Sequence, residues 1–371
     1  MTRLIVAAGG GGDAVAAAML DAALYGTKNP AVILTYAWDR LLIDPLPGPR
    51  APSDFTHLEP LTRHVWSVPT EARPIAPAGS TLPRLASELP HTLALIDPYN
   101  GTQGLVRQLQ DLVCHLEPTS IDLLDVGGDI LARGDEPTLK SPLADALTLA
   151  ACCQVNAPVR LLIAGPGLDG ELPVAEVQSL LGPLVHTFTA KDTEPVDSVL
   201  EWHPSEATGM LAATARGVRG ICEVRDAGLP IPLTDTSPTV HEVDLDATLS
   251  RNKLADAILS TTTLAEAETQ SREICGHSEI DYERKKAARL KNHSPAEEFN
   301  PSAVLSRLNR FENEARNRGM THTTFRHLTE ALALPGNQRE SLRALLMQTK
   351  PERYTAPLWN LTTTEPRTPT P

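Results

Sequence analysis

The sequence predicts an α/β fold with a mainly parallel sheet and helices on both of its faces. Two observations carry this prediction. Short apolar runs alternate, up to about residue 225, with segments whose apolar residues recur at helical spacing. The runs are continuously apolar instead of alternating with polar residues, which is typical of strands that are covered on both faces.

The expected elements follow one another in a regular order. Strand-like runs cover residues 3–8, 31–36, 91–97, 120–126 and 159–165, with a late strand at 220–225. Helical patterns cover residues 13–25, 82–89, 102–116, 142–155, 173–182 and 205–216. The segment from Pro45 to Pro90 is rich in proline, and we expect most of it to be irregular.

The character of the sequence changes after about Asp246, because residues 250–347 are more charged and almost wholly helical in pattern. We therefore expect an α/β ligand-binding domain at 1–246, a helical C-terminal subdomain at 247–360 and a disordered tail at 361–371. The helical region carries two apolar stripes, which are Val304, Leu305, Leu308 and Phe311, and then Phe325, Leu328, Leu332 and Leu334. Such stripes need a surface to pack on, which favours a homodimer through these helices. The alternative is a lid over the strand ends, from which Arg326 or His327 would reach a ligand.

Composition and charge exclude several classes of partner. The net charge of −13 disfavours nucleic acid and anionic membranes. No apolar stretch reaches the roughly 18 residues that span a bilayer, and the N-terminal run has no signal-peptide pattern. The five cysteines form no CxxC pair. We expect a cytoplasmic protein with a small-molecule substrate, and neither a nucleic-acid nor a membrane partner.

Four consecutive glycines, Gly9, Gly10, Gly11 and Gly12, follow the first strand-like run. With Ala14 they satisfy the pattern G-x-G-x-x-[GA] between a strand and a helix, where backbone amides can hold a phosphate. The alternative is a tight turn without a ligand. Asp13 either caps the helix or takes part in chemistry. A dinucleotide site would need an acid after the second strand, and Asp39 lies rather far along for that role.

A second motif, DVGGD, ends the strand-like run at 120–126. Asp125 and Asp129 flank Gly127 and Gly128, and paired carboxylates on such a turn suit a ribose diol, a Mg²⁺ ion or an acid/base pair. We therefore take Asp125 and Asp129 as candidate catalytic residues, together with Asp13 and Asp97.

Two further strand ends supply candidate ligand-binding residues. Asp97 ends another apolar run and is followed by the turn residues Asn100 and Gly101. The stiff segment at 38–50 begins with Trp38, Asp39 and Arg40 and ends with Arg50, and its two arginines are candidates for clamping an anion. A fifth glycine-rich strand end, AGPGLDGE at 164–171, is less distinctive. The histidines show no zinc spacing, so no metal ligands are assigned.

The motifs AAGGGGDA, WDR…DP.PGPR and DVGGD…SPL.D together resemble a bacterial and archaeal family called domain of unknown function 1152. The resemblance covers about residues 1–235 and implies a Rossmann-like α/β domain. It implies no established activity and no catalytic residues.

The motifs favour an enzyme that acts on a phosphorylated, nucleotide-like small molecule by group transfer or hydrolysis. In this hypothesis the glycines cradle phosphate and the paired aspartates act on the substrate, with Mg²⁺ or a nucleotide as the candidate cofactor. Two alternatives stay open, an NAD(P)-dependent oxidoreductase and a non-catalytic nucleotide-binding sensor or scaffold.

Overall fold

A computed structural model of the chain describes residues 2–225, 228–291 and 298–362. Its centre is a mixed nine-stranded sheet with the order β10-β13-β9-β8-β1-β2-β7-β5-β4. The five central strands are parallel, and they are β7 (Thr92–Ile96), β2 (Val32–Tyr36), β1 (Leu4–Ala7), β8 (Ile121–Val126) and β9 (Val159–Ala164). The predicted α/β fold with a mainly parallel sheet is confirmed.

Antiparallel strands extend the sheet at both sides. On one side β13 (Thr239–Val243) pairs with β9, and β10 (Leu184–Thr187) pairs with β13. On the other side β5 (Trp66–Ser67) pairs with β7 and β4 (Glu59–Pro60) with β5, while β3 (Phe55–Thr56) and β6 (Arg73–Pro74) form a separate pair. Strands β10 and β13 were not predicted, because they are partly polar and only partly buried.

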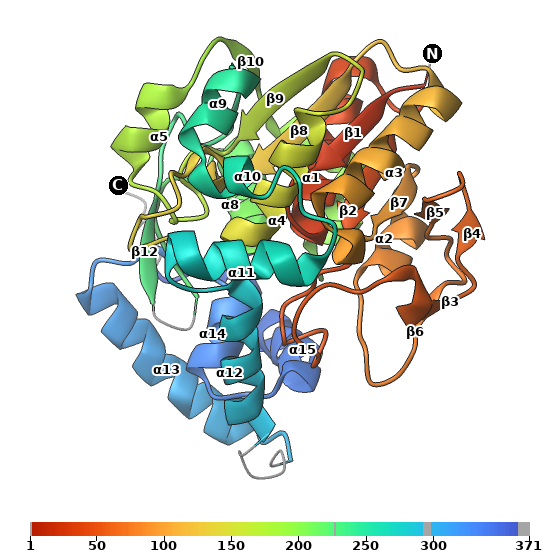
Figure 1. The fold of residues 1–371 in the computed structure, drawn as a ribbon. Coiled ribbons are helices and arrows are strands. Elements are labelled where there is room, and N and C mark those ends of the chain that lie inside the picture. Colours follow the sequence, from red (N-terminus) through yellow and green to blue (C-terminus); the bar gives the residue numbers. More distant parts are fainter. Residues whose placement is uncertain (1, 226–227, 292–297, 363–371) are drawn as a thin grey trace.

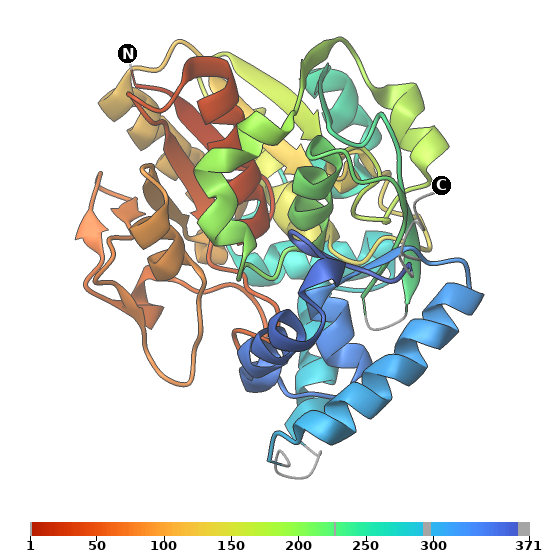
Figure 2. The ribbon, with the colours of Figure 1, turned by 180° about the vertical axis from the view of Figure 1, so that it is seen from behind.

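Helices cover both faces of the sheet, as predicted (Figures 1 and 2). One face packs against α1 (Gly11–Tyr25), α2 (Leu82–Glu88), α7 (Asp197–Leu200) and α8 (Glu206–Ala215), and α6 (Ala190–Thr193) packs on α1 and α8. The other face packs against α3 (Gly101–Leu116), α4 (Pro142–Cys152), α5 (Val174–Leu180), α10 (Lys253–Ala257) and α11 (Leu264–Cys275), beside α9 (Leu245–Arg251). In β1 the apolar side chains alternate, since Ile5 belongs to the first core and Leu4 to the second.

The C-terminal region contains the expected helices together with strands that the pattern did not predict. Helices α12 (Glu279–Lys291), α13 (Pro301–Asn317), α14 (Phe325–Ala331) and α15 (Arg339–Thr349) lie below the main sheet in Figure 1. The strands β14 (His322–Thr324), β15 (Tyr354–Thr355) and β16 (Leu358–Asn360) join β11 (Gly220–Val224) and β12 (Leu229–Leu233) in a second, five-stranded sheet. The predicted tail lies almost wholly outside the described residues.

The apolar stripes of the C-terminal helices pack on each other within the chain. Val304 and Leu308 of α13 share a buried cluster with Leu328 of α14 and Trp359 of β16. Helices α10 and α11, by contrast, belong to the core of the main sheet. A boundary at residue 246 and a homodimer therefore stay predictions, and the stripes do not need a second copy of the chain to be buried.

Candidate active site at the carboxyl edge of the sheet

A cavity of about 140 Å³ opens at the carboxyl edge of the parallel strands. Among the described residues, nine acidic side chains and three arginines line it, which are Asp13, Asp39, Asp125, Asp129, Asp145, Asp169, Glu171, Glu206, Glu279, Arg40, Arg225 and Arg326. The residues after β1 and those at the end of β8 form its centre. The sheet grows from β1 to β2 and β7 on one side and then continues with β8 and β9 on the other side of β1, so β1 and β8 flank the point where the strand order reverses. Open α/β sheets bind ligands at such a switch point.

The glycine run lines the cavity and also allows three other segments to approach α1 closely. A Cβ atom at Gly10 would lie 2.8 Å from the carbonyl oxygen of Trp38, and one at Gly11 would lie 2.9 Å from Thr81 Oγ1. A Cβ at Gly12 would collide with the side chain of Ser205. Close packing therefore accounts for these glycines. The first amides of α1 still have no acceptor within the helix, and Gly10 provides no side-chain cap.

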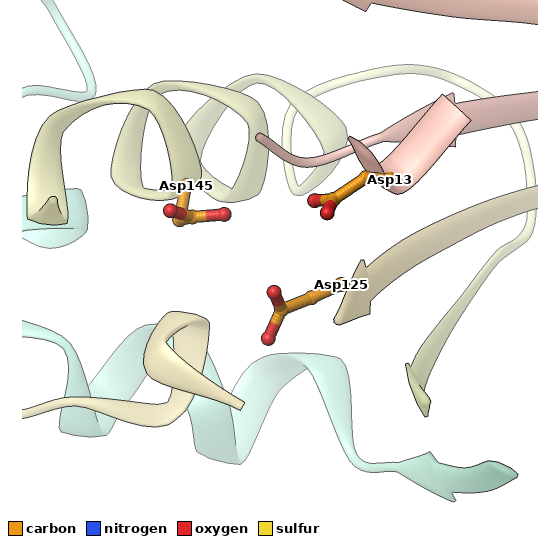
Figure 3. Close-up of side chains that lie close together, drawn as sticks. All are labelled: Asp13, Asp125 and Asp145. Atoms are coloured by element: carbon orange, nitrogen blue, oxygen red, sulfur yellow. The ribbon is translucent and has the colours of Figure 1, made fainter. Parts of the chain in front are cut away.

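Asp13, Asp125 and Asp145 come together from three different elements, namely the first turn of α1, the end of β8 and the first turn of α4. One carboxylate oxygen from each lies within 4.8 Å of the other two. Figure 3 shows the three side chains pointing toward one another. Asp125 is 1% exposed and Asp145 is 5% exposed, and each has one buried oxygen without a hydrogen-bond partner among the described residues.

Burial and mutual repulsion hold these carboxyl groups toward their neutral forms. Burial raises the pKa of Asp13 to about 7, against a weaker lowering by the amide of Gly9, which donates a hydrogen bond of 2.8 Å to Asp13. Burial and the charge of Asp13 raise the pKa of Asp125 well above its usual range, and burial and the charge of Asp125 do the same to Asp145. At neutral pH the cluster therefore favours either protons or a bound cation.

Four further acids of the cavity also have raised pKa values, and one is Asp39, whose pKa burial raises despite its hydrogen bonds from Thr81. Asp129, in the turn after β8, is shifted well upward by burial and then by Asp145 and Asp125. Burial and the neighbouring Glu171 raise the pKa of Asp169 to about 7. Burial and Glu283 raise the pKa of Glu279 to about 8. Carboxyl groups with pKa values near neutrality, as for Asp169 and Glu279, are suited to general acid/base catalysis.

Two buried acids of the cavity are fully paired instead. Glu171 accepts hydrogen bonds from Arg225 at 2.8 Å and from Ser141 Oγ at 2.7 Å. Glu206 forms an ion pair with Arg326 at 3.3 Å and accepts from the amide of Arg225. Burial alone would raise both pKa values. The charge of Arg225 with the hydrogen bonds from Lys140 and Ser141 lowers the pKa of Glu171, and the charge of Arg326 with the hydrogen bonds from Thr324 and Arg225 lowers that of Glu206.

The three arginines lie where the cavity meets a larger groove. Arg40, Arg225 and Arg326 line both the cavity and the groove, which has a volume of about 1690 Å³. Arg40 makes no ion pair within 4.0 Å in the described part of the chain. Although burial opposes it, the charges of Glu279 and Glu283 raise the pKa of Arg40, which stays cationic.

The cavity brings together most of the candidate residues from the sequence analysis. Gly9, Gly10, Gly11, Gly12, Asp13, Trp38, Asp39, Arg40, Asp125 and Asp129 all line it. Gly127 and Gly128 lie beside it in the turn between Asp125 and Asp129, where both have positive φ angles of 117° and 111°. A Cβ at Gly127 would collide with the Asp169 carboxylate, so this glycine makes room for a neighbouring acid.

Four candidates lie outside the cavity. Arg50 is buried in an ion pair of 2.9 Å with Asp44, and it donates to the carbonyls of Pro47 and Gly48, an arrangement that does not support an anion clamp. Asp97 accepts a hydrogen bond from the amide of Tyr99. Asn100 is exposed, and Gly101 packs against the backbone of Thr261.

Two of the lining residues are held by structural contacts. Both carboxylate oxygens of Asp39 accept hydrogen bonds from Thr81, one from the amide at 3.0 Å and one from the hydroxyl at 2.8 Å. Trp38 donates its indole hydrogen to the Glu283 carboxylate at 3.1 Å. Asp39 and Trp38 therefore fix the end of β2 to α2 and to α12.

Sequence reasoning assigned no role in the main site to seven lining residues, which are Asp145, Asp169, Glu171, Glu206, Arg225, Glu279 and Arg326. Asp145 belongs to the quoted motif SPL.D, and Asp169 and Glu171 belong to AGPGLDGE, so a signal existed for these three. Arg326 was considered only for a lid. Glu206, Arg225 and Glu279 lie in segments without a distinctive local motif.

These features define an α/β protein with a Rossmann-like parallel sheet and a carboxylate-rich cavity at its switch point. The chain matches, over residues 4–287, the model of the family described as "Protein of unknown function (DUF1152)", and it belongs to that family. The match extends past the expected limit near residue 235 and includes α9, α10 and α11 and most of α12. No curated protein and no solved structure matches the chain.

No helix in the described ranges is both long and apolar enough to cross a bilayer.

Proposed function

We propose that the protein is an enzyme that acts on a phosphorylated, nucleotide-like small molecule by group transfer or hydrolysis at this cavity. The observation that carries the proposal is the position of Arg40, Arg225 and Arg326 at the boundary between the cavity and the outer groove. Guanidinium groups bind phosphate oxygens through several charge-assisted hydrogen bonds. Arg225 and Arg326 already pair with Glu171 and Glu206, so Arg40, which makes no ion pair among the described residues, is the guanidinium open to an anionic group there.

Different groups around this boundary would bind the substrate and take part in the reaction. The amino end of α1 adds amides and a favourable helix dipole on the inner side, where Gly10, Gly11 and Gly12 line the wall. The outer groove offers space for the rest of the substrate, to which the phosphate is attached. Asp129, with its raised pKa, would exchange a proton with the reacting group.

The two alternatives have less support from the site. In an oxidoreductase Asp39 would bind a ribose diol, but its two oxygens already accept hydrogen bonds from Thr81. A non-catalytic sensor could use the same phosphate contacts, but it gives no reason for a group of acids with pKa values near neutrality. Both alternatives stay hypotheses.

The experiment is a binding and turnover screen with inorganic phosphate, nucleoside mono-, di- and triphosphates and sugar phosphates. Binding is measured by isothermal titration calorimetry and products by ³¹P NMR. We expect at least one compound to bind and react. Arg40→Ala should weaken its binding by about 10-fold or more, because a charged hydrogen bond is lost, and Asp129→Asn should slow its turnover by about 10²-fold or more.

The matched control is Arg63→Ala, because Arg63 is an exposed arginine that lines neither the cavity nor the groove. It removes the same charge and should leave binding and turnover unchanged. The proposal is wrong if no phosphorylated compound binds, or if Arg40→Ala binds the active compound as the Arg63→Ala control does. Binding without turnover would support the sensor.

A further inference from the structure

We infer that Asp13, Asp125 and Asp145 form a binding site for one divalent metal ion, of the magnesium, manganese or calcium class. The three side chains come from α1, β8 and α4, and an oxygen of each lies within 4.8 Å of the others (Figure 3). Carboxylate oxygens on opposite sides of one ion are about 4.2 Å apart for Mg²⁺ and about 4.6–5.2 Å apart for Ca²⁺, from twice the usual bond length. The cluster therefore has the size of a single coordination sphere.

A second, independent observation is the missing partner of two of these carboxylates. Asp125 Oδ2 and Asp145 Oδ1 are buried and accept no hydrogen bond from the described residues. Buried polar atoms in folded proteins are almost always paired, and an unpaired buried carboxylate is strongly unfavourable. The equally buried Glu171 of the same cavity has three donors, Lys140 N, Ser141 N and Ser141 Oγ, besides Arg225. One oxygen of Asp125 and one of Asp145 thus have no donor among the described residues, and both side chains point toward Asp13 in Figure 3.

The donor set decides the class of ion. All three groups offer carboxylate oxygen, and no histidine or cysteine belongs to the cluster. Oxygen ligands suit hard cations such as Mg²⁺, Mn²⁺ and Ca²⁺, whereas zinc sites use nitrogen and sulfur more often. The arginines lie at the outer boundary of the cavity, so they do not occupy this point.

The role of the ion rests on the proposed function. Binding of the ion does not, because it does not require a substrate. An ion at this point, beside the amino end of α1, would supply charge neutralisation and orientation for a phosphate group. Asp13, Asp125 and Asp145 would hold it, and Asp129 would stay available for proton transfer.

The test uses the full-length protein after removal of metals with a chelator, and it contains no phosphorylated compound. Free Mn²⁺ is followed by electron paramagnetic resonance during a titration, and Mg²⁺ and Ca²⁺ by calorimetry. We expect one ion per chain. Asp125→Asn and Asp145→Asn should each weaken binding of the ion by at least about 10- to 100-fold. Replacing a residue that only hydrogen-bonds to a metal ligand already has an effect of that size.

Asp122→Asn is the matched control, because Asp122 lies on the same strand but pairs with Arg160 at the opposite edge of the sheet. It should bind the ion as the unmodified protein does. Circular dichroism of all three variants checks that they are folded, and the asparagine replacements keep the shape of the side chain. The inference is overturned if the protein binds no divalent ion, in which case the acids hold protons, or if the two cluster variants bind as the control does. Ion binding without any phosphorylated ligand would leave this inference intact and count against the proposed function alone.

Discussion

Helix α1 carries one aspartate at each edge of the main sheet, and the surroundings of the two differ sharply. Asp21, at the amino edge, accepts hydrogen bonds from Arg3 at 2.7 Å and from the amide of Ala31 at 3.0 Å, and lies 3.1 Å from His91 Nε2. Burial raises its pKa, but His91 and Arg3 outweigh burial and bring the pKa to about 2. Asp13, at the carboxyl edge, has a pKa of about 7.

Strand β8 repeats the contrast. Asp122, near its amino end, forms two hydrogen bonds with Arg160, at 2.8 and 2.9 Å. Asp125, near its carboxyl end, keeps a buried oxygen without a partner among the described residues. The same residue type therefore stabilises the fold at one edge and opposes it at the other. Groups that oppose folding persist where they serve a ligand or a reaction, which makes the carboxyl edge the functional one.

The largest effect on stability should come from Asp21→Ala. The substitution leaves Arg3 and His91 without their shared carboxylate and the amide of Ala31 without an acceptor. Removing one partner of a buried pair lowers the free energy of unfolding by about 3 kcal/mol or more. Urea unfolding followed by circular dichroism measures this loss. In the matched variant Asp13→Ala, on the same helix, we expect a change below about 1 kcal/mol. Equal losses in the two variants would contradict the contrast between the edges.

The second prediction concerns pH in chelator-treated protein. Asp169 has a pKa of about 7 and Glu279 of about 8, above their ordinary values of 3.8 and 4.5. The folded state therefore holds more protons than the unfolded state from about pH 4 to about pH 8, so stability falls as the pH rises through this range. We expect a loss of at least about 2 kcal/mol between about pH 5 and pH 8 by urea unfolding.

The contribution of Asp21 to stability changes with pH in the opposite direction, because its pKa in the folded state, about 2, is below the ordinary 3.8. Its contribution is present above about pH 4 and is lost as the pH falls toward 2. Glu279→Gln serves as the check on the alkaline side and should make the fall toward pH 8 shallower. A stability that is constant or rises from pH 5 to pH 8 would show that the cavity acids are not strained.

A smaller effect of opposite sign is expected for Asp125→Asn. The neutral amide no longer has to carry a charge in a buried site, so at about pH 8 the metal-free variant should be about 1 kcal/mol more stable than the unmodified protein. At about pH 5 the gain should be smaller, because the raised pKa of Asp125 favours its neutral form as the pH falls. Thermal and urea unfolding at the two pH values measure the difference. A loss of stability at pH 8 would mean that Asp125 has a favourable partner when charged.

The contrast between the edges also explains which parts of the molecule the sequence could predict. The five parallel strands are mainly apolar runs, and the turns after β1 and β8 contain glycines at fixed places, so both were visible locally. The strands β14–β16 were missed because they are only two or three residues long and form part of a sheet with β11, far earlier in the chain.

The site was predicted in the same uneven way. Asp13, Asp125 and Asp129 follow from motifs at strand ends. Glu279 and Arg326 reach the cavity from helices more than a hundred residues after β8, and only tertiary packing brings them there. Arg50 is the opposite case. It lies in a loop of the expected composition, but it pairs with Asp44 and donates hydrogen bonds to backbone carbonyls instead of facing the cavity. A motif indicates which groups are near a strand end, whereas the pairing of each group depends on residues elsewhere in the chain.

For Asp122→Asn we expect an effect as small as that of Asp125→Asn, but in the opposite direction. The carboxylate and the Arg160 guanidinium meet in two parallel hydrogen bonds, but the Arg160 side chain is 32% exposed, so water and salt screen the pair. We expect a loss of about 1 kcal/mol in the free energy of unfolding, at the upper end for a partly exposed pair because of its two-point geometry. A double-mutant cycle with Arg160→Met isolates the interaction, and its coupling energy should fall at about 1 M NaCl. A loss as large as that of Asp21→Ala would mean that solvent exposure does not determine the strength of these ion pairs. A coupling energy near zero would mean that, of Asp21 and Asp122, only Asp21 stabilises the fold through its partners.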